Sequence, residues 1–330
     1  MDSLAPVEVA PHGRHNVPVG AAWGVAMACF YSSVFLIWGR MTKVLPSPVV
    51  GFGAYAGALL VIVVGLLLAG RGEHLRPARR HWSGLLIIGA IGFTINASAL
   101  AGIALSTATK AAILTRTDTF FAALLAVLFI GERLGRGAIP GLLLMFAGAG
   151  LSMDVRLSEL TLPSGADLLF LVAALCLGLN AVIIKTRLRH LSRFTVAAFN
   201  IGVTMCLFAV LVTVGGQWGE VSRLVSPALG LPILLCGCLM VGSYISYYSA
   251  LALLQSWEAR SFSLLVPPIV GVASLILFGE TVGGVRVAGM ACVVAGALIV
   301  NRARSAEEQR VLHSGAELRC GGLSERRDVE

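Results

Sequence analysis

Charged side chains are scarce in this chain. They make up 13% of its 330 residues, and hydrophobic residues make up 57%, whereas about a quarter of the residues of a soluble domain are charged. The mean hydropathy is +0.87. The apolar stretches also lack the alternation of barrel strands, and a backbone in lipid must satisfy its own hydrogen bonds. These absences exclude a soluble enzyme and a membrane barrel. They predict an all-α integral membrane protein embedded in the lipid bilayer.

Motifs for chemistry on a substrate are also missing. All six histidines lie in tails or connections, without an H-x-x-x-H pattern or paired acids, which argues against a lipid-modifying enzyme. A G-x-x-x-x-G-K-[ST] loop for a nucleotide is absent, which argues against a primary pump. Cys236 and Cys238 have no histidine or acid nearby, and buried free cysteines behave as small hydrophobes. We therefore expect no catalytic residue, no metal and no cofactor.

The apolar residues gather in ten runs along the chain. A helix that crosses about 30 Å of hydrocarbon needs about 20 residues, and most of the runs approach this length. The fifth and tenth runs are shorter than the others. The predicted spans are residues 21–38, 49–69, 83–103, 108–130, 138–153, 168–184, 195–214, 229–254, 256–278 and 285–300.

The pattern of these runs occurs twice in the sequence. A shift of 148 positions sets Glu132 over Glu280 and aligns the flanking residues without a gap. The first copy reads Leu-Phe-Ile-Gly-Glu at 128–132, and the second reads Ile-Leu-Phe-Gly-Glu at 276–280. A glutamate at the C-terminal end of a helix opposes the helix dipole. We therefore expect Glu132 and Glu280 to be structural latches that accept hydrogen bonds from a neighbouring segment.

The duplication also sets the domain organisation. Five crossings per copy is an odd number, so the second copy must enter the membrane from the opposite face. Such inverted repeats form the two halves of secondary transporters, with the substrate site between them near the midplane. The expected parts are a cytoplasmic tail at 1–20, the first repeat at 21–154, the second repeat at 165–301 and a disordered cytoplasmic tail at 302–330.

The net charge of +8 follows the topology of the chain. Of the 25 basic residues, 18 fall in the two tails, in the even-numbered connections or near the same side of the membrane, and 6 fall on the other side. Cytoplasmic loops carry such an excess of lysine and arginine. The sequence therefore predicts a multi-pass protein of the cell membrane with both termini in the cytoplasm, and it argues against a nucleic-acid partner.

The repeated motifs resemble those of the drug/metabolite transporter superfamily, and within it the EamA-type ten-helix exporters. The matching segments are 128–134 and 277–282, each followed by a glycine-rich helix, and the likeness extends over about residues 20–301. The resemblance implies a small-molecule substrate such as an amino acid, a drug, a sugar or another metabolite. The family also places a proline within the fourth helix of each copy. Here the second copy has Pro267-Pro268, whereas the first has Thr119-Phe120.

Arg116 and Asp118 are the charged residues placed deepest in the predicted membrane. At about 1.5 Å per residue they lie near the middle of the fourth span, where charged groups usually face the protein interior or a wet cavity. Two residues apart on a regular helix, they point about 200° away from each other and should not pair directly. Each needs another partner, so a cavity site and a structural ion pair both stay open.

Lys110 is expected to reach the membrane surface, and for Arg260 a surface position and a functional role both stay open. Lys110 and Arg260 lie near the ends of their predicted spans, where long side chains can extend to the interface. No second basic residue is then placed as deep as Arg116. Because arginine is permanently charged and planar, Arg116 predicts a single carboxylate or phosphate on the solute. If protons drive transport, Asp118 is the expected carrier, because it is the only acid placed in the hydrocarbon.

Several uncharged polar residues also lie within the spans. Asn96, Asn180, Tyr244 and Tyr248 are candidates for a solute pocket, although polar groups in spans often only tie helices together. Pro267 and Pro268 predict a kink, because proline cannot donate the helical hydrogen bond. The carbonyl groups that the prolines leave without donors could face a cavity.

The sequence as a whole favours a secondary transporter that works by alternating access. The expected cargo is a small metabolite, an amino-acid-like compound or a drug, anionic or zwitterionic, and the expected direction is export. A passive channel or a membrane scaffold is the alternative, and a lipid-modifying enzyme is less favoured. Protons as the coupling ion and a homodimer as the assembly stay open.

Overall fold

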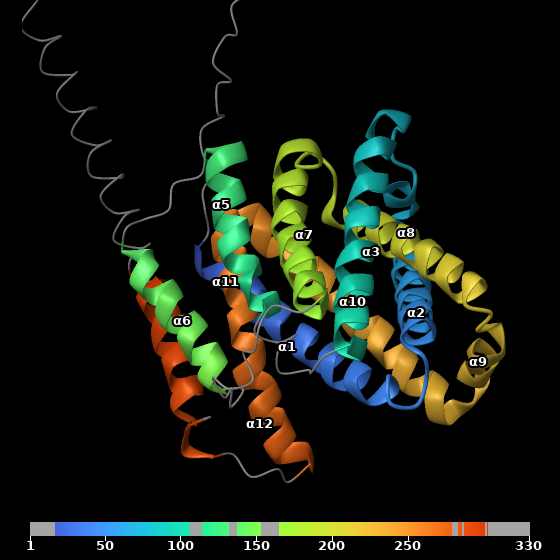
Figure 1. Cartoon of the computed structure of the whole chain (residues 1–330). Coiled ribbons are helices and arrows are strands. Elements are labelled where there is room, and N and C mark those ends of the chain that lie inside the picture. The colour runs from blue at the N-terminus through green and yellow to red at the C-terminus, as the bar shows by residue number, and fades with distance from the viewer. Residues whose placement is uncertain are drawn as a thin grey trace, which may run out of the picture.

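The computed structural model describes residues 17–105, 114–131, 137–152, 165–278, 283–285, 287–300 and 302. Within these ranges every regular element is an α-helix or a 3-10 helix, as Figure 1 shows. The predicted all-α fold is confirmed. The expectations for the two tails concern residues that lie mostly outside the described ranges.

Six of the described helices are long and apolar enough to cross a membrane. They correspond to the first, second, third, sixth, seventh and eighth predicted spans, with ends shifted by a few residues. The first begins at Val17, four residues before the predicted span. These helices are α1 (Val17–Met41), α2 (Ser47–Leu68), α3 (Trp82–Leu105), α7 (Gly165–Arg187), α8 (Arg193–Val214) and α10 (Pro227–Leu253).

The remaining elements are short. The fifth and tenth predicted spans are indeed short helices, α6 (Ala138–Ser152) and an unlabelled helix at Val287–Val300. Connections between the long helices carry small turns of helix. These are η1 (Gly72–Leu75), η2 (Arg79–His81), α9 (Trp218–Ser222) and η5 (Arg223–Val225).

The fourth and ninth spans differ from the regular helices that the sequence predicts. In the fourth, the described part is a 3-10 turn, η3 (Thr115–Thr117), followed by α5 (Asp118–Ile130). The ninth is divided into α11 (Ser256–Ser261), the 3-10 segment η6 (Phe262–Leu265) and α12 (Val266–Phe278). The 148-residue shift places η3 on η6. The two copies are therefore irregular at the same place.

The cause of the irregular turn differs between the copies. In the second copy Pro267 has no N–H to give the carbonyl of Ser263, so the α-helical bond between them cannot form. That carbonyl accepts instead from the N–H of Val266, which is a 3-10 bond. In the first copy, which lacks a proline, the Thr117 hydroxyl donates to the Leu114 carbonyl at 2.6 Å. In the first copy the irregular turn is therefore accompanied by a side-chain hydroxyl that bonds to the carbonyl three residues earlier.

The helix contacts follow a two-fold pattern. Helix α1 packs along α10, and the repeat-equivalent pair is α7 with α3, which also pack along each other. Likewise α2 packs on α10 and α8 on α3, while α2 and α8, which are equivalent to each other, are in mutual contact. Each repeat therefore lays its helices against those of the other repeat.

The two short helices contact each other closely across the repeats. A Cβ atom built on Gly148 would lie 2.7 Å from the carbonyl oxygen of Gly289, and one on Gly141 would lie 2.8 Å from that of Gly296. These two contacts exchange under the 148-residue shift, as a two-fold axis requires. The two helices lie side by side at one edge of the bundle (Figure 1).

Alanine at these glycines gives a test of the packing. Gly148→Ala should destabilise the protein by about 1–3 kcal/mol, because the new methyl group meets a backbone oxygen that cannot move aside. Gly150 lies on the same helix with no atom within 4 Å of a built Cβ. Gly150→Ala should therefore be neutral or stabilise by up to about 1 kcal/mol. Thermal unfolding in detergent compares the two, and equal effects would contradict this contact.

The repeated glycine-glutamate motif is described only in part. Helix α5 ends at Gly131, whose φ of +72° is left-handed and suits a residue without Cβ. This explains the glycine of the first copy. Glu132 and Glu280, the expected latches, lie outside the described residues.

Candidate functional site

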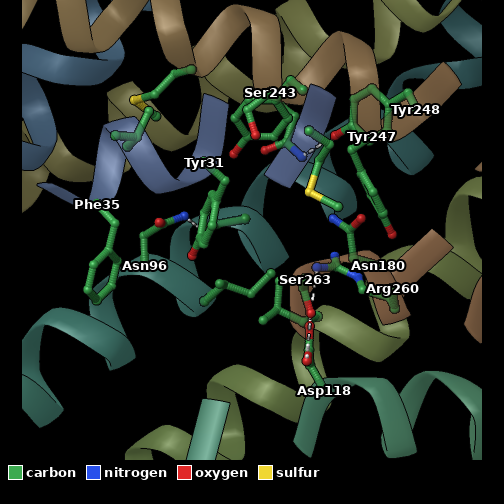
Figure 2. A pocket seen from close by; sticks show the side chains of 18 of the residues that line it. Tyr31, Phe35, Asn96, Asp118, Asn180, Ser243, Tyr247, Tyr248, Arg260 and Ser263 are labelled. Atoms are coloured by element: carbon green, nitrogen blue, oxygen red, sulfur yellow. Dashed lines mark hydrogen bonds and ion pairs between the residues drawn. The ribbon is translucent and has the colours of Figure 1, made fainter. Parts of the chain in front are cut away.

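A cavity of about 110 Å³ lies between the two repeats. Its walls come from α1, α2, α3 and the η3–α5 junction of the first repeat, and from α7, α8, α10 and the α11–η6 segment of the second. All five tyrosines of the chain line this cavity. Figure 2 shows Asp118, Arg260 and Ser263 together in one part of it, and Phe35 and Asn96 in another.

The cavity gathers all six residues that the sequence placed in a solute pocket. They are Asn96, Arg116, Asp118, Asn180, Tyr244 and Tyr248. Pro267 and Pro268 do not line it, and they act on it only through the shape of the ninth span. Both expected charged residues are buried, with exposed fractions of 6% for Arg116 and 1% for Asp118.

Arg116 bridges the two irregular turns. Its Nη1 donates to the Ser263 carbonyl at 2.9 Å, which is the carbonyl that Pro267 cannot serve. The guanidinium also lies over the ring of Tyr31, with 5.9 Å from Cζ to the ring centroid. Its Nε is buried without an acceptor in the described part of the chain. Arg116 therefore donates one hydrogen bond to the protein through Nη1, while its Nε beside the cavity has no acceptor among the described residues.

Asp118 pairs with an arginine that the sequence reasoning placed elsewhere. Its Oδ2 lies 3.4 Å from Nη1 of Arg260, and its Oδ1 accepts from the Ser263 hydroxyl at 3.5 Å. Arg260 is 8% exposed and lines the cavity, so the surface position that the sequence left open for it is wrong. It is excluded because α11 begins inside the protein, where Ser256 is fully buried.

Arg260 also carries a ring contact. Its Cζ lies 4.4 Å from the ring centroid of Tyr247, a cation–π distance. Its Nε, like that of Arg116, is buried without an acceptor among the described residues. Figure 2 shows the side chain of Tyr247 directed from α10 toward Arg260. The described walls of the cavity thus hold two arginines and one aspartate, which leaves one positive charge in excess.

Hydrogen bonds between tyrosines and amides surround the cavity, and the one between Tyr55 and Tyr244 joins the two repeats. The amide of Asn96 donates to the Tyr55 hydroxyl at 2.7 Å, and this hydroxyl lies 3.0 Å from that of Tyr244. The amide of Asn200 donates to the Tyr248 hydroxyl at 2.8 Å. These contacts are the helix ties that the sequence left open as an alternative. The same side chains nevertheless face the cavity, so the two interpretations apply together.

Contacts near the start of α1 hold helix ends together on one side of the bundle. A Cβ on Gly20 would lie 2.5 Å from the Leu254 side chain, so α1 and the end of α10 touch. The Nζ of Lys185 donates to the Leu254 carbonyl at 2.7 Å, and Nη1 of Arg193 donates to the Ser249 hydroxyl at 2.9 Å. We call this the basic end, because the connections rich in arginine lie here.

The basic end also joins a connection of the first repeat to one of the second. Nδ1 of His81, just before α3, lies 3.1 Å from Nε2 of His190, just after α7. The ring of His74 stacks on that of Phe194 at the start of α8, with centroids 5.8 Å apart. Direct contacts between the repeats therefore continue from the cavity to this surface.

The sequence profile of one family matches both copies. The profile of the EamA-like transporter family covers residues 18–153 and again 164–302. The chain belongs to this family. It is thus an EamA protein of the drug/metabolite transporter superfamily and a membrane transporter, as the resemblance of its repeated motifs implied.

The fold of this EamA chain also occurs among solved structures. One crystal structure of a protein superposes with a TM-score of 0.69 and 16% identity, over 85% of this chain and 96% of the other. That likeness supports the fold alone. No curated protein matches the chain.

Among the cavity residues that the sequence reasoning did not assign to the pocket are Trp38, Tyr55, Asn200 and Arg260. The signal for Tyr55 was its place inside the second predicted span, since Tyr244 and Tyr248 were chosen for lying within the eighth. Trp38 lies near the end of α1, and its Nε1 is buried without an acceptor in the described part of the chain. No local pattern marked Arg260, because its burial depends on where α11 begins.

Proposed function

We propose that this chain is a secondary transporter that carries a small anionic or zwitterionic solute through the cavity between its two repeats. The solute would be an amino-acid-like compound, another metabolite or a drug. The cavity would open in turn to the two sides of the membrane as the repeats rock against each other. The expected direction is export, as in the EamA-type exporters that the motifs resemble.

One observation supports a negative charge on the solute. The Nε atoms of Arg116 and Arg260 are buried beside one cavity without acceptors among the described residues. Buried donors normally have a partner, and leaving one unpaired costs free energy. The cavity also has one positive charge in excess. A carboxylate would supply both the missing acceptors and the missing charge.

The rest of the wall favours a solute with an apolar body. Tyrosine rings, Phe35 and two methionines surround the space, with a few amides and hydroxyls between them. The indole Nε1 of Trp38 is a third donor without an acceptor in the described part of the chain. Tyr31 beside Arg116 and Trp38 are seven residues apart on α1, or about 10 Å along the axis. A second acceptor on the solute at about this distance would satisfy Trp38.

The helix contacts at the basic end support alternating access. At that end Gly20 of the first repeat meets Leu254 of the second, while Lys185 and Arg193 bind α7 and α8 to α10 within the second repeat. Because the repeats are inverted, an equivalent set of contacts could close the other end when these open. If the excess of arginine marks the cytoplasm, the basic end is cytoplasmic and so are both termini.

Cysteine introduced at Glu159 should then react with an impermeant maleimide in intact cells, because the connection between the fifth and sixth spans would face the outside. A reaction that occurs only after permeabilisation would reverse the topology.

Counterflow with purified protein in liposomes tests the proposed function. We expect L-phenylalanine or benzoate inside the liposomes to drive entry of the same labelled compound. Phenylalaninamide keeps the ring and the amine but lacks the carboxylate, and it should give no counterflow. Equal counterflow of the acid and the amide, or none with any carboxylate, would contradict an anion-selective cavity.

A further inference from the structure

The pair of Asp118 and Arg260 joins the two repeats at the cavity wall. Asp118 is the first residue of α5 in the first repeat, and Arg260 lies on α11 in the second. The distance of 3.4 Å between their nearest charged atoms exceeds the 2.7–2.9 Å that is typical of charge-assisted hydrogen bonds. The contact is also single, although a guanidinium can hold a carboxylate with two bonds. The pair is therefore loosely made for one that is fully buried.

Few charged groups other than Arg260 face the Asp118 carboxylate. Arg116 lies two residues before it, and Ser263 and Thr119 offer hydroxyls to Oδ1. On α7, which packs along α5, the cavity-lining residues are Leu177 and Asn180, and neither titrates. The N-terminus of α5 adds a partial positive charge. Among the described residues, Arg260 is thus the one cation that contacts this carboxylate through its side chain.

Arg260 can keep one contact while it changes another. The Tyr247 ring lies near the guanidinium, and a cation–π contact depends on the charge of that group rather than on its N–H groups. Those groups lie in the plane, where Nη1 meets Asp118 and Nε meets no acceptor in the described part of the chain. A small turn about the ring could therefore direct the same guanidinium toward an anion in the cavity.

We propose that Arg260 is shared between Asp118 and the negative group of the solute, and that Asp118 takes up one proton when the solute takes Arg260. The inference rests on the proposed function. In the empty cavity Arg260 neutralises Asp118. When a solute carboxylate binds to Arg260, an ionised Asp118 would be left buried without its partner, which is strongly unfavourable. A proton from water on Asp118 removes that charge, so one proton binds with each anion.

Because the proton and the solute bind together, the proposal determines the direction in which each moves. Both occupy the cavity in the same state, so both cross the membrane in the same direction. An inward proton gradient would then draw the solute inward, and export would need an outward gradient of the solute. The cavity keeps one positive charge in excess when it holds one anion and one proton, as it does when it is empty.

The test is the pH dependence of binding. The probes are labelled benzoate and labelled L-phenylalanine, with purified full-length protein in detergent. For the wild type we expect the affinity to rise as pH falls, approaching tenfold per pH unit at the limit of one proton per anion. Asp118→Asn should bind at every pH as tightly as the wild type does at low pH. Arg260→Gln should bind weakly and with no pH dependence.

The controls separate this inference from the proposed function. Asp167 is a buried acid on α7 that does not line the cavity, and Asp167→Asn should keep the wild-type dependence. If Asp118→Asn does not fold, calorimetry of the wild type in two buffers of different ionisation enthalpy should still show one proton taken up per anion. Binding that is independent of pH, or an unchanged dependence in Asp118→Asn, would overturn the sharing of Arg260 and leave the anion site intact. Absence of binding by both probes at every pH would overturn both.

Discussion

Arg116→Gln should lower counterflow of a carboxylated solute by roughly tenfold to a hundredfold. A hydrogen bond to a charged group contributes about 1.5–3 kcal/mol, and this substitution removes the charge and the planar fork together. It also cancels the excess positive charge of the cavity, because Arg260 and Asp118 then balance each other. Arg116→Lys keeps the charge without the fork and should fall between the wild type and Arg116→Gln.

The alternative for Arg116 is a purely structural role. Its Nη1 already donates to the Ser263 carbonyl at 2.9 Å, so loss of this bond could loosen the two irregular turns. Thermal unfolding of both variants separates the roles. A folded Arg116→Gln with little transport supports solute binding. Full transport by this variant, or its failure to fold while Arg116→Lys is normal in every respect, would assign the residue to the scaffold.

Replacing both Pro267 and Pro268 with alanine should abolish transport while it raises stability. With N–H groups restored, the Ser263 and Leu264 carbonyls can accept α-helical bonds, and η6 can become regular. A 3-10 turn advances 120° per residue and an α-helix about 100°, so four converted residues change the relative rotation of α11 and α12 by about 80°. Arg260 on α11 would then turn away from Asp118.

The matched control for this change is another proline inside a membrane helix. Pro232 lies within α10 and does not line the cavity. Pro232→Ala should leave counterflow near the wild-type rate. The account of the irregular turn would be wrong if the Pro267→Ala/Pro268→Ala variant transported normally, or if Pro232→Ala had the same effect.

The sequence predicted the helices better than it predicted the site. Apolar runs and the 148-residue repeat were enough for ten spans in two inverted copies, because hydrocarbon thickness and backbone hydrogen bonding leave few choices. The six candidate pocket residues do converge on one cavity. Their depth in the spans was the useful signal, since a polar group near the midplane is costly unless it faces the protein interior.

The remaining part of the site depends on irregular backbone that local patterns do not reveal. Arg260 was placed by counting along a regular helix from the membrane surface, whereas α11 starts at a buried turn. The irregular turn of the fourth span has no proline, and only its Thr117 hydroxyl bond distinguishes it locally. Such errors are expected where tertiary contacts, rather than propensity, decide where a helix begins.

The central claim is that solute passes through the cavity between the repeats. Ser243 lines this cavity on α10, and cysteine is close to serine in size. In a variant without native cysteines, Ser243→Cys should react with a small polar thiol reagent, lose counterflow on reaction, and react more slowly when benzoate or L-phenylalanine is present. A cysteine at the exposed Ser226 should react without loss of transport. Full counterflow after complete modification of Ser243→Cys, with no protection by either solute, would contradict the account.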